Sequence, residues 1–297
     1  MDLTAIVTTY RSPRSLELCL AALAADAGGL ALELLVCDDG DVEHQSRGPA
    51  GAAAASGAFA SVRRLWQEHG GYGKCRLANK AAAVARAPLL FYLDGDCLVA
   101  RGTLRAHLGL AGPRRYVAGN ALRLGQRASA ELSVEDARAF RHASPGFIAR
   151  QALRGEIEAK AHYALLRWAG LAPLFRRVGR GGFNGGCSTV PLELLREVNG
   201  WEESLPGYGF DDTDLGHRLQ NAGAVPVNAR LDALVVHLWH DRPYRDPALF
   251  EERRKLVAAT LHGPHVRAVR GLEQQGPHDA GVWEEIWKPD DVPPLAV

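Results

Sequence analysis

The chain has 297 residues, of which 47% are hydrophobic and 23% are charged, and its formal net charge at pH 7 is +1. This length and composition are those of a globular protein with one large domain or two small ones. A charge so close to zero excludes the strong basic footprint of most nucleic-acid-binding proteins, so we expect no nucleic-acid partner. The five cysteines form no C-x-x-C pair and lie mostly in apolar runs, as reduced core residues of a cytosolic protein do.

The first residues, MDLTAIVTTYRS, begin a strand directly and lack the charged and apolar regions of a signal peptide. No apolar run approaches the ~20 residues that a bilayer-spanning helix needs. We therefore expect a cytoplasmic protein that is at most peripheral at the inner membrane face.

Strand and helix patterns alternate through the first hundred residues. Strands are predicted at 3–10, 32–40 and 88–96, and helices at 12–29 and 75–87. A short helix is predicted at 55–65, overlapping a strand pattern at 62–68. This order predicts an α/β fold with a Rossmann-like, mainly parallel sheet that is covered by helices on both faces.

Polar side chains follow three of the predicted strands. They are Thr8, Thr9 and Tyr10 after the first, Asp38 and Asp39 after the second, and Asp94 and Asp96 after the last. Ligands of parallel sheets bind beyond the carboxyl ends of the strands, so we expect the three clusters to open on one crevice. Helix caps and turns would explain any one cluster well, but three together poorly.

The segment FYLDGDCLV, residues 91–99, carries two carboxylates one residue apart. Alternate side chains of a strand share a face, so Asp94 and Asp96 can point into one pocket, and Gly95 lets a ligand approach the backbone. Carboxylate oxygens favour Mg²⁺ or Mn²⁺ held together with substrate phosphates. The same spacing is also common in solvated turns, so this motif needs support from the rest of the chain.

Four segments together resemble, in order, the signature segments of family 2 glycosyltransferases with the GT-A fold. They are VTTYRSPRSLELCLAAL, LELLVCDDGD, NKAAAVARAPLLFYLDGDC and NGWEESLPGYGFDDTDLGHRLQNAG, which span roughly residues 3 to 240. WQEHGGYGKCRLANKAA and VVHLWH further resemble a bacterial polysaccharide-type branch with chondroitin-polymerase-like domains. The resemblance implies a GT-A domain at 1–245, with a nucleotide-binding half at 1–100, a helical insertion at 125–180 and an acceptor and metal half at 181–245. A C-terminal helical extension would follow at 246–297.

The resemblance also implies a donor site and a metal. The donor would be a nucleotide sugar, usually a UDP-sugar, with Thr8, Tyr10 and Asp39 holding its uracil and ribose. Asp94 would lie near the ribose and the metal.

The metal would be bound by Asp96. His237 would complete its coordination, with His240 as the alternative. Imidazole favours Mn²⁺ over Mg²⁺, so Mn²⁺ is the expected ion and Mg²⁺ the second choice.

A second carboxylate cluster, Asp211, Asp212 and Asp214, stands in GYGFDDTDLGHRL. Acids favour a first helical turn, but three within four residues repel one another. By the resemblance, Asp212 is the general base that takes the proton from the acceptor hydroxyl, and Asp211, in place of the usual Glu, bonds to an acceptor hydroxyl. Asn184 in GGFNGGC would lie in the segment that closes over the donor sugar, and we count it with Asp211 among the acceptor contacts.

The chain departs from the branch pattern at two positions. His69 stands where Asp is frequent, and Ala78 stands where an Arg commonly precedes Asn79. Either Lys74 or Arg76 would supply the missing cation.

The segment 138–180 carries nine Lys and Arg against two Glu. Apolar residues from Leu153 to Phe175, at steps of three and four, predict one helix through this segment. Such a helix usually packs on the core with solvated basic flanks, but it can also bind an anionic membrane or a phosphate-bearing acceptor. Near the C-terminus we expect a helix at 246–263, and Trp283 packed with Trp287.

The combined expectation is an inverting, metal-dependent glycosyltransferase that moves a sugar onto a hydroxyl of a glycan or lipid-linked acceptor, in surface polysaccharide or glycolipid assembly. A nucleotidyltransferase is the first alternative, although VTTYRSPRS lacks the Gly-rich, Lys-containing phosphate loop of that class. The second alternative is a non-catalytic module that binds nucleotide sugars or glycans.

Overall fold

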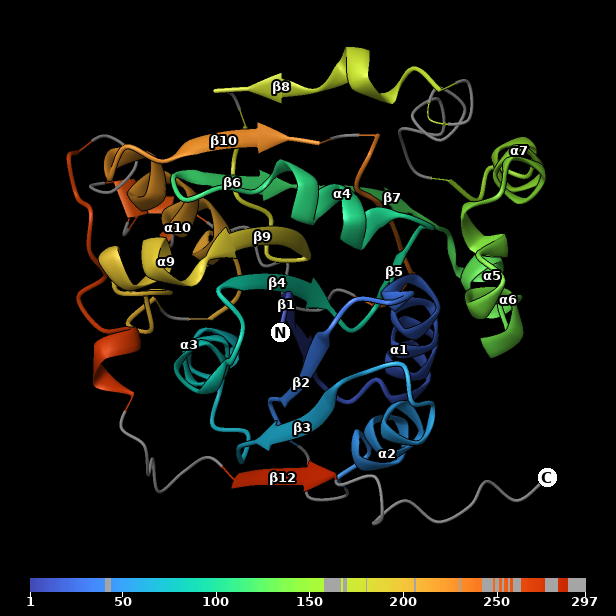
Figure 1. Cartoon of the computed structure of the whole chain (residues 1–297), viewed down its shortest axis with the longest axis horizontal. Helices are drawn as coiled ribbons and strands as arrows, with labels where there is room; N and C mark the ends of the chain where they lie inside the picture. Colours follow the sequence, from blue (N-terminus) through green and yellow to red (C-terminus); the bar gives the residue numbers. More distant parts are fainter. Residues whose placement is uncertain are drawn as a thin grey trace.

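The computed structural model describes residues 1–40, 44–157, 167, 170–179, 181–205, 207–229, 231–241, 248, 251–252, 254–255, 257–258, 263–275 and 283–287. Within this part of the chain a mixed sheet of nine strands crosses the molecule, in the order β12-β3-β2-β1-β4-β9-β6-β10-β8 (Figure 1). A smaller sheet, in the order β5-β11-β7, lies beside it.

The strands of the large sheet are β1 (Leu3–Thr9), β2 (Leu32–Asp38), β3 (Ser61–Trp66), β4 (Leu89–Asp94), β6 (Arg115–Ala118), β8 (Arg177–Val178), β9 (Cys187–Pro191), β10 (Val225–Asn228) and β12 (Trp283–Trp287). Those of the small sheet are β5 (Cys97–Val99), β7 (Asn120–Arg123) and β11 (Leu234–His237). Strands β3, β2, β1 and β4 run parallel, and β9 is antiparallel to both β4 and β6. The mainly parallel sheet predicted from the sequence is thus confirmed.

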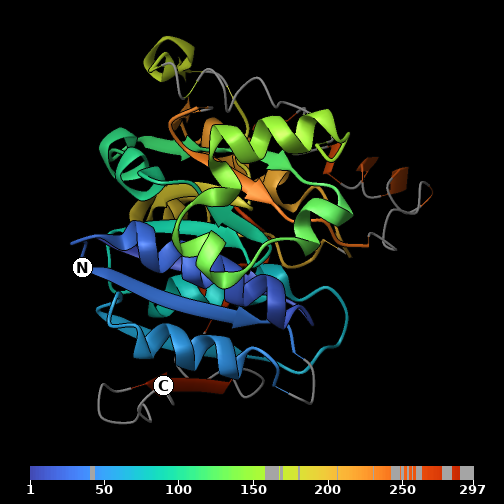
Figure 2. The ribbon, with the colours of Figure 1, turned by 90° about the vertical axis from the view of Figure 1, so that its right-hand side faces the viewer.

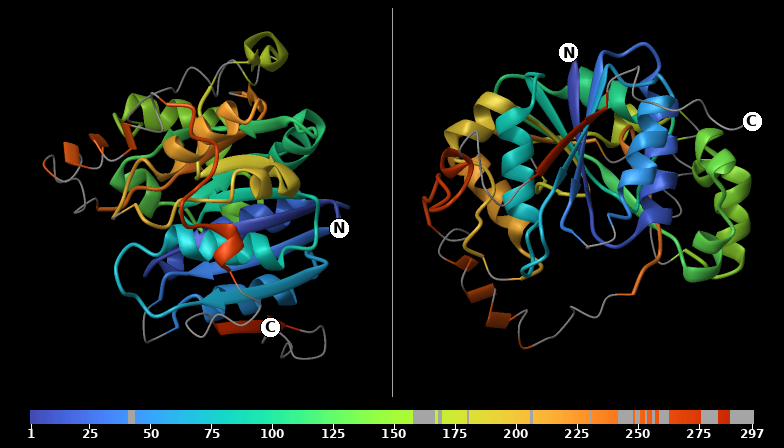
Figure 3. Two further views of the ribbon diagram at one scale, coloured as in Figure 1. Left: turned by 90° about the vertical axis from the view of Figure 1, so that its left-hand side faces the viewer. Right: turned by 90° about the horizontal axis from the view of Figure 1, so that it is seen from below.

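The α-helices are α1 (Pro13–Ala27), α2 (Arg47–Ala55), α3 (Lys74–Val84), α4 (Thr103–Leu110), α5 (Gln126–Ala130), α6 (Val134–Arg138), α7 (Pro145–Leu153), α9 (Leu192–Glu197) and α10 (Asp211–Asn221). Short 3₁₀ turns lie at Arg141–Ala143, Ala172–Phe175 and Leu272–Gln274. Helices α1, α2 and α4 cover one face of the large sheet, and α3, α9 and α10 cover the other (Figure 3). Helices α5 to α7 pack outside α1 (Figure 2).

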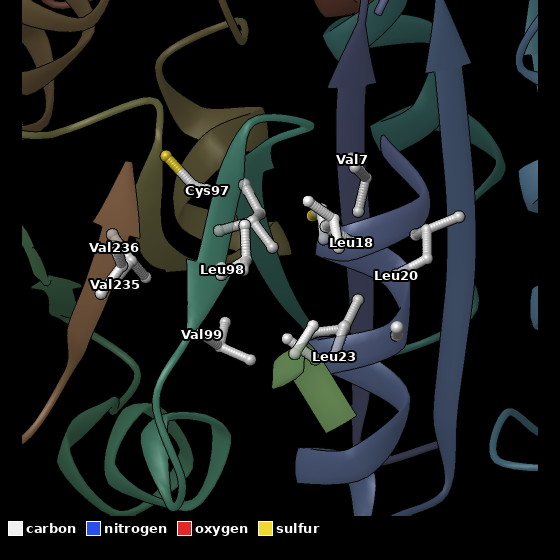
Figure 4. Packing of buried hydrophobic residues seen from close by; sticks show 14 of the residues in the cluster. Val7, Leu18, Leu20, Leu23, Cys97, Leu98, Val99, Val235 and Val236 are labelled. Atoms are coloured by element: carbon white, nitrogen blue, oxygen red, sulfur yellow. The ribbon is translucent and has the colours of Figure 1, made fainter. Parts of the chain in front are cut away.

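The core divides into two layers because β1 alternates its side chains. Val7 packs with α1 and with β5 and β11, as the close view shows, while Ile6 points to the layer under α3 and α10 (Figure 4). Both side chains are fully buried. The sheet is therefore anchored on both faces, which fixes the carboxyl ends of β1, β2 and β4 relative to one another.

The predicted helix at 55–65 is wrong. The alanine-rich helix α2 ends at Ala55, Gly57 adopts a left-handed φ of +67°, and Ser61–Trp66 is strand β3. Tertiary contacts determine that residues 61–66 form a strand, because Arg63 is buried against Glu33 of the neighbouring strand.

The single helix predicted from Leu153 to Phe175 is also wrong in the residues described. Helix α7 ends at Leu153, whose side chain is 90% exposed, and Gly155 has a left-handed φ of +70°. Ile157 then forms an isolated bridge with Leu124. A glycine in this conformation ends the helix, so the apolar spacing does not mark one face. Residues 158–166, 168 and 169 lie outside the described part.

The C-terminal expectations hold only in part. The described residues between 248 and 258 are helical, while Trp283–Trp287 is a strand that pairs antiparallel with β3. The side chain of Trp283 lies outside the described part of the structure, so its packing with Trp287 stays a prediction. Trp287 itself packs against the core on the α1 and α2 side of the sheet.

All five cysteines are free and buried, as predicted. Among the described residues, no helix combines the length and the apolar character that a membrane crossing requires.

Candidate active site

The carboxyl ends of β1, β2 and β4 meet as the sequence predicts. Thr8 stands opposite Asp94 in the β1–β4 register, and its hydroxyl donates to Oδ1 of Asp94 over 3.0 Å. The backbone N–H of Asp39 donates to the carbonyl of Thr9 over 3.0 Å. Asp38 is different, because its carboxylate accepts from Arg64 and Ser46 inside the protein. Asp38 therefore stabilises the fold, and the other residues border the crevice.

Lys74, at the start of α3, is the cation that enters this crevice. Its Nζ lies 2.6 Å from Oδ1 of Asp94. Burial raises the pKa of Asp94, but the charge and the hydrogen bond of Lys74, together with smaller effects of His237 and Thr8, outweigh burial and leave that pKa below its usual value. Burial likewise opposes the charge of Lys74, yet Asp94 and Asp211 raise the pKa of this amine. Of the two cations left open by the sequence, Arg76 instead donates to Gln67 over 3.3 Å.

Tyr10 and Asp39 lie on either side of His69. The rings of Tyr10 and His69 stack, with centroids 4.6 Å apart and planes at 28°. His69 Nδ1 is 3.7 Å from Oδ2 of Asp39. Asp39 also accepts from Gln67 over 2.7 Å and from the backbone N–H of Gly73 over 2.8 Å. Burial raises the pKa of Asp39, against these two hydrogen bonds.

The predicted metal ligands are Asp96, in the turn between β4 and β5, and His237, at the end of β11. Strands β5 and β11 are antiparallel neighbours, with Cys97 opposite His237. This pairing brings the side chains of Asp96 and His237 together, although they are 141 positions apart in the sequence. His237 Nε2 lies 3.7 Å from Asp96 Oδ1, and His240 Nε2 lies 3.3 Å from Asp96 Oδ2. Both histidines that the sequence offered as alternatives are therefore present.

These three residues fit a divalent ion. One ligand atom from each lies within 4.8 Å of the others. His237 Nδ1 is 2.6 Å from the carbonyl of Leu238, and His240 Nδ1 is 2.8 Å from the carbonyl of Asp241. With the proton on Nδ1, each ring presents its Nε2 lone pair towards Asp96, which is the orientation that metal-ligating histidines take. One carboxylate with two imidazoles is a donor set suited to Mn²⁺.

Helix α10 begins with the second carboxylate cluster. Phe210, just before it, has a left-handed φ of +69°, and Asp211 accepts from the hydroxyl of Tyr72 over 2.9 Å. Burial and then the charge of Asp211 raise the pKa of Asp212 to about 6, against the opposing charge of Lys74. A carboxylate with this pKa is largely ionised at neutral pH and can accept a proton, which suits a general base.

Asp214 has a structural role. It forms a buried ion pair with Arg218, one turn along α10, at 2.7 Å. Arg218 also donates to the carbonyls of Val198 and Gly200. The cluster thus contains one acid that holds the helix in place and two whose charges act on Lys74.

Asn184 stands in the glycine-rich loop before β9. Its side-chain oxygen accepts from the backbone N–H of Gly186 over 3.0 Å, and its own N–H donates to Ser188. A Cβ on Gly186 would stand 2.9 Å from Oδ2 of Asp94, so this loop lies directly against the Asp94 side chain. Contact of Asn184 with a sugar stays a prediction.

Two side chains at this site, Tyr72 and Tyr208, are not predicted from the sequence. Their rings meet edge to face, with centroids 5.7 Å apart. The only signal in the sequence is that each tyrosine stands between two glycines, at 71–73 and 207–209. Asn79, in contrast, is a structural residue that exchanges hydrogen bonds with the backbone of Trp201.

The mixed sheet, with threonines at the end of β1 and carboxylates at the ends of β2 and β4, defines the class of protein as one with the GT-A fold. Solved structures with this architecture include the mannosyltransferase PcManGT from Pyrobaculum calidifontis in complex with GDP-Man and Mn²⁺, at 19% identity and a TM-score of 0.53 over 85% of this chain. TarS from S. aureus is similar at 14% identity and a TM-score of 0.55 over 93% of this chain. GalNAc-T7 with UDP, GalNAc and Mn²⁺ is similar at 12% identity and a TM-score of 0.51 over 86%.

In sequence, residues 4–147 match the family model described as Glycosyl transferase family 2. This match covers just under half of the chain and includes β1 to β4 and the Asp94–Asp96 pair. The chain spans 60% of the length of PcManGT, 48% of GalNAc-T7 and 41% of TarS. No curated protein matches the sequence.

Proposed function

We propose that this protein is a family 2 glycosyltransferase that moves one sugar from a nucleotide diphosphate sugar to an acceptor hydroxyl, with a divalent metal and with inversion at the anomeric carbon. The observation that carries the proposal is that three groups lie close enough to act on one another electrostatically: the Lys74–Asp94 pair, the Asp96–His237–His240 cluster, and Asp212. The family match of residues 4–147 and the likeness of the fold to glycosyltransferase structures support it.

In this proposal the nucleotide lies over the ends of β1 and β2. Tyr10 offers an aromatic face for the base, and Asp39 offers a carboxylate whose position Gln67 and Gly73 fix. Thr8 and Asp94 lie where the ribose would follow, one strand further along the sheet. The usual donor of the resembling family, a UDP-sugar, is the donor we propose.

The metal would be held by Asp96, His237 and His240, with Mn²⁺ as the preferred ion. When bound, such an ion stabilises the negative charge of the departing diphosphate as a Lewis acid. Lys74 adds a fixed positive charge to the same crevice. Because its ammonium is held by Asp94, this charge needs no reorganisation during the reaction.

Asp212 would act as the general base. It accepts the proton of the acceptor hydroxyl while that oxygen attacks the anomeric carbon from the face opposite the diphosphate, which gives inversion in a single displacement. Asp211, held by the Tyr72 hydroxyl, would orient the acceptor through a hydrogen bond. Asn184 belongs to the loop that borders the donor sugar and the incoming hydroxyl.

The test is release of the nucleoside diphosphate from a panel of nucleotide sugars with Mn²⁺, by wild type and by Asp212→Asn. We expect the variant to bind UDP and Mn²⁺ as the wild type does and to turn over no donor. Wild-type turnover by the variant would reject Asp212 as the base. Calorimetry that shows UDP binding without hydrolysis or transfer would favour a binding module.

The biological setting is part of the same proposal. We place the enzyme in the cytoplasm, in surface polysaccharide or glycolipid assembly, with a glycan or lipid-linked acceptor. The Lys- and Arg-rich sequence 138–180 is the segment that would contact the inner membrane face. Sedimentation with anionic liposomes tests that attachment, and a protein that stays in the supernatant would exclude it.

A further inference from the structure

The backbone that carries the two histidines of the metal cluster leaves the small sheet between them. Strand β11 ends at His237, whose carbonyl accepts from the N–H of Leu124 over 3.0 Å. The N–H of Leu238 then donates to the carbonyl of Asp96 over 2.8 Å. Neither neighbouring strand, β5 or β7, continues past this point. Strand pairing itself thus brings Asp96 and His237 together.

The next backbone group, the N–H of Trp239, is bound by a side chain. It donates to the hydroxyl oxygen of Ser129 over 2.8 Å, across 110 positions of sequence. Ser129 lies in α5 and is only 5% exposed. A hydroxyl accepts a backbone N–H as a strand carbonyl would. Because Trp239 stands between His237 and His240, this bond fixes the path of the chain to the second histidine.

Helix α5 holds Ser129 in place although it has only five residues, too few for a stable helix by itself. At its start, the carboxylate of Glu156 accepts from two backbone N–H groups over 3.1 and 3.2 Å. At its end, the guanidinium of Arg14, in α1, donates to the carbonyl of Ser129 and to two carbonyls that follow it. Both ends are therefore tied to other parts of the fold, and α5 lies with its neighbours outside α1 (Figure 2).

His240 differs from the other two members of the cluster in what places it. It lies three residues beyond the end of β11, so no strand pairing sets its position. Its Nε2 nevertheless lies 3.3 Å from Asp96 Oδ2, and its ring centroid lies 5.3 Å from that of His237. The bond from Trp239 to Ser129 is the side-chain contact described for the backbone between the two histidines.

We propose that Ser129 is a positioning residue of the metal centre, whose hydroxyl holds the Trp239 backbone so that His240 joins Asp96 and His237 around one ion. The proposal rests on metal binding in the proposed function and adds what gives the centre two imidazole ligands rather than one. Since imidazole favours Mn²⁺ over Mg²⁺, Ser129 also contributes to the choice of ion. The segment inserted at 125–180 thereby has a part in metal binding.

The experiment uses the full chain with Mn²⁺ alone. Electron spin echo modulation counts the imidazole nitrogens bound to the ion, and electron paramagnetic resonance of free Mn²⁺ gives the affinity. We expect two nitrogens in the wild type and one in Ser129→Ala, with binding about tenfold weaker, as for loss of other groups that orient a metal ligand. Adding Ser129→Ala to His240→Ala should change the affinity by less than about twofold, because both substitutions remove the same ligand. Ser129→Thr, which keeps the hydroxyl, should retain both nitrogens.

Ser133→Ala is the matched control. Ser133 begins the next helix, α6, and its hydroxyl accepts from the backbone N–H of Asp136 over 3.2 Å. The substitution therefore removes the same kind of bond from the same segment, and we expect it to lower Tm while both nitrogens and the Mn²⁺ affinity stay as in the wild type.

The outcomes separate the role of Ser129 from the metal site itself. Two nitrogens and wild-type affinity in Ser129→Ala would overturn the positioning role and leave the metal site standing. An equal loss in Ser133→Ala would also overturn it, because the effect would then be a general loss of stability. A wild type with a single nitrogen would remove His240 from the centre and the role of Ser129 with it. A wild type that binds no Mn²⁺ would overturn both this inference and the metal dependence of the proposed function.

Discussion

Lys74 Nζ lies 2.6 Å from Asp94 Oδ1, so the first residue of α3 and the last residue of β4 form one ion pair at the centre of the crevice. The pair lies between the nucleotide side, where Thr8 also bonds to Asp94, and the acceptor side, where the Lys74 charge acts on Asp212. A single ammonium group therefore couples the two halves of the proposed site.

Replacing Lys74 by Met should impair both halves. Asp94, only partly exposed, would lose its partner, and we expect a loss of unfolding free energy of about 1–3 kcal/mol. We also expect the UDP dissociation constant to rise about tenfold or more, measured by calorimetry with Mn²⁺. Arg105→Met is the control, because it removes an arginine on α4 that bonds to the carbonyl of Gly28, away from the proposed site. Equal effects of the two substitutions on UDP binding would contradict the role of Lys74.

Activity should fall as the pH falls through about 6. The pKa of Asp212 is raised to about 6 by burial and by Asp211, and a general base must be ionised to accept a proton. We expect kcat/KM against pH to rise with an apparent pKa near this value and to level off above it. A profile that is flat between pH 5 and 8, with the protein still folded, would be inconsistent with Asp212 as the base.

The stability effects at Asp212 and Asp214 should have opposite signs. The folded-state pKa of Asp212 is above its ordinary value of 3.8, so the protonated form stabilises the fold, and this contribution is lost as the pH rises through about 6. Asp212→Asn should therefore raise the unfolding free energy at pH 7.5 by on the order of 1 kcal/mol, and should have little effect below pH 4. Asp214→Asn leaves Arg218 buried without its carboxylate and should cost about 3 kcal/mol at pH 7.5. Urea unfolding at both pH values measures these differences.

The strands on the donor side of the fold can be predicted from local sequence patterns. Which of two nearby cations, Lys74 or Arg76, pairs with Asp94 cannot. Alternating apolar residues place β1 and β4, and the rule that parallel strands end at one edge then brings Thr8 to Asp94. The preference for Lys74 over Arg76 depends on where α3 starts relative to β4, which no local pattern encodes.

The dependence on contacts between distant segments also explains why local sequence patterns do not predict β12 and β3. Strand β12 pairs with β3 across more than two hundred residues, and its alternation of WEEIW is too short to stand out from a loop. At β3, two consecutive arginines hide a buried strand, because Glu33 and Asp38 from β2 neutralise them in the folded state only. Contacts between distant segments thus decide the elements that composition misjudges.

Both histidines of the metal cluster should be needed for tight Mn²⁺ binding. We expect His237→Ala and His240→Ala each to weaken Mn²⁺ binding by about tenfold or more, because each removes one of three protein ligands. Electron paramagnetic resonance of free Mn²⁺ measures this without reference to activity. His217→Ala, on α10 and outside the cluster, is the control. If His240→Ala binds Mn²⁺ as tightly as the wild type, only Asp96 and His237 remain as ligands.

Gly73 should be needed for the base site. A Cβ there would stand 1.8 Å from Gln67 Nε2 and 2.5 Å from Asp39 Oδ1, so Gly73→Ala must displace both side chains. We expect UDP binding to weaken by about tenfold, with a smaller change in Tm. Gly70→Ala is the matched control in the same loop, since a Cβ there meets nothing within 4 Å. Unchanged UDP binding in Gly73→Ala would show that Asp39 does not contact the nucleotide.

Removing strand β12 should expose an edge of the sheet. Its residues pair with β3 from Val62 to Trp66, Glu284 bonds to Arg63, and Glu285 bonds to Arg64. Truncation after Gln275 therefore uncovers backbone groups of β3 and removes a carboxylate partner from each of its two arginines, which keep Glu33 and Asp38 of β2 (Figure 1). Because an uncovered edge strand pairs with other chains, we expect a lower Tm and concentration-dependent association in sedimentation velocity. Truncation after Trp287 keeps β12 and serves as the control, and a shorter chain that stays monomeric with an unchanged Tm would show that β12 does not protect this edge.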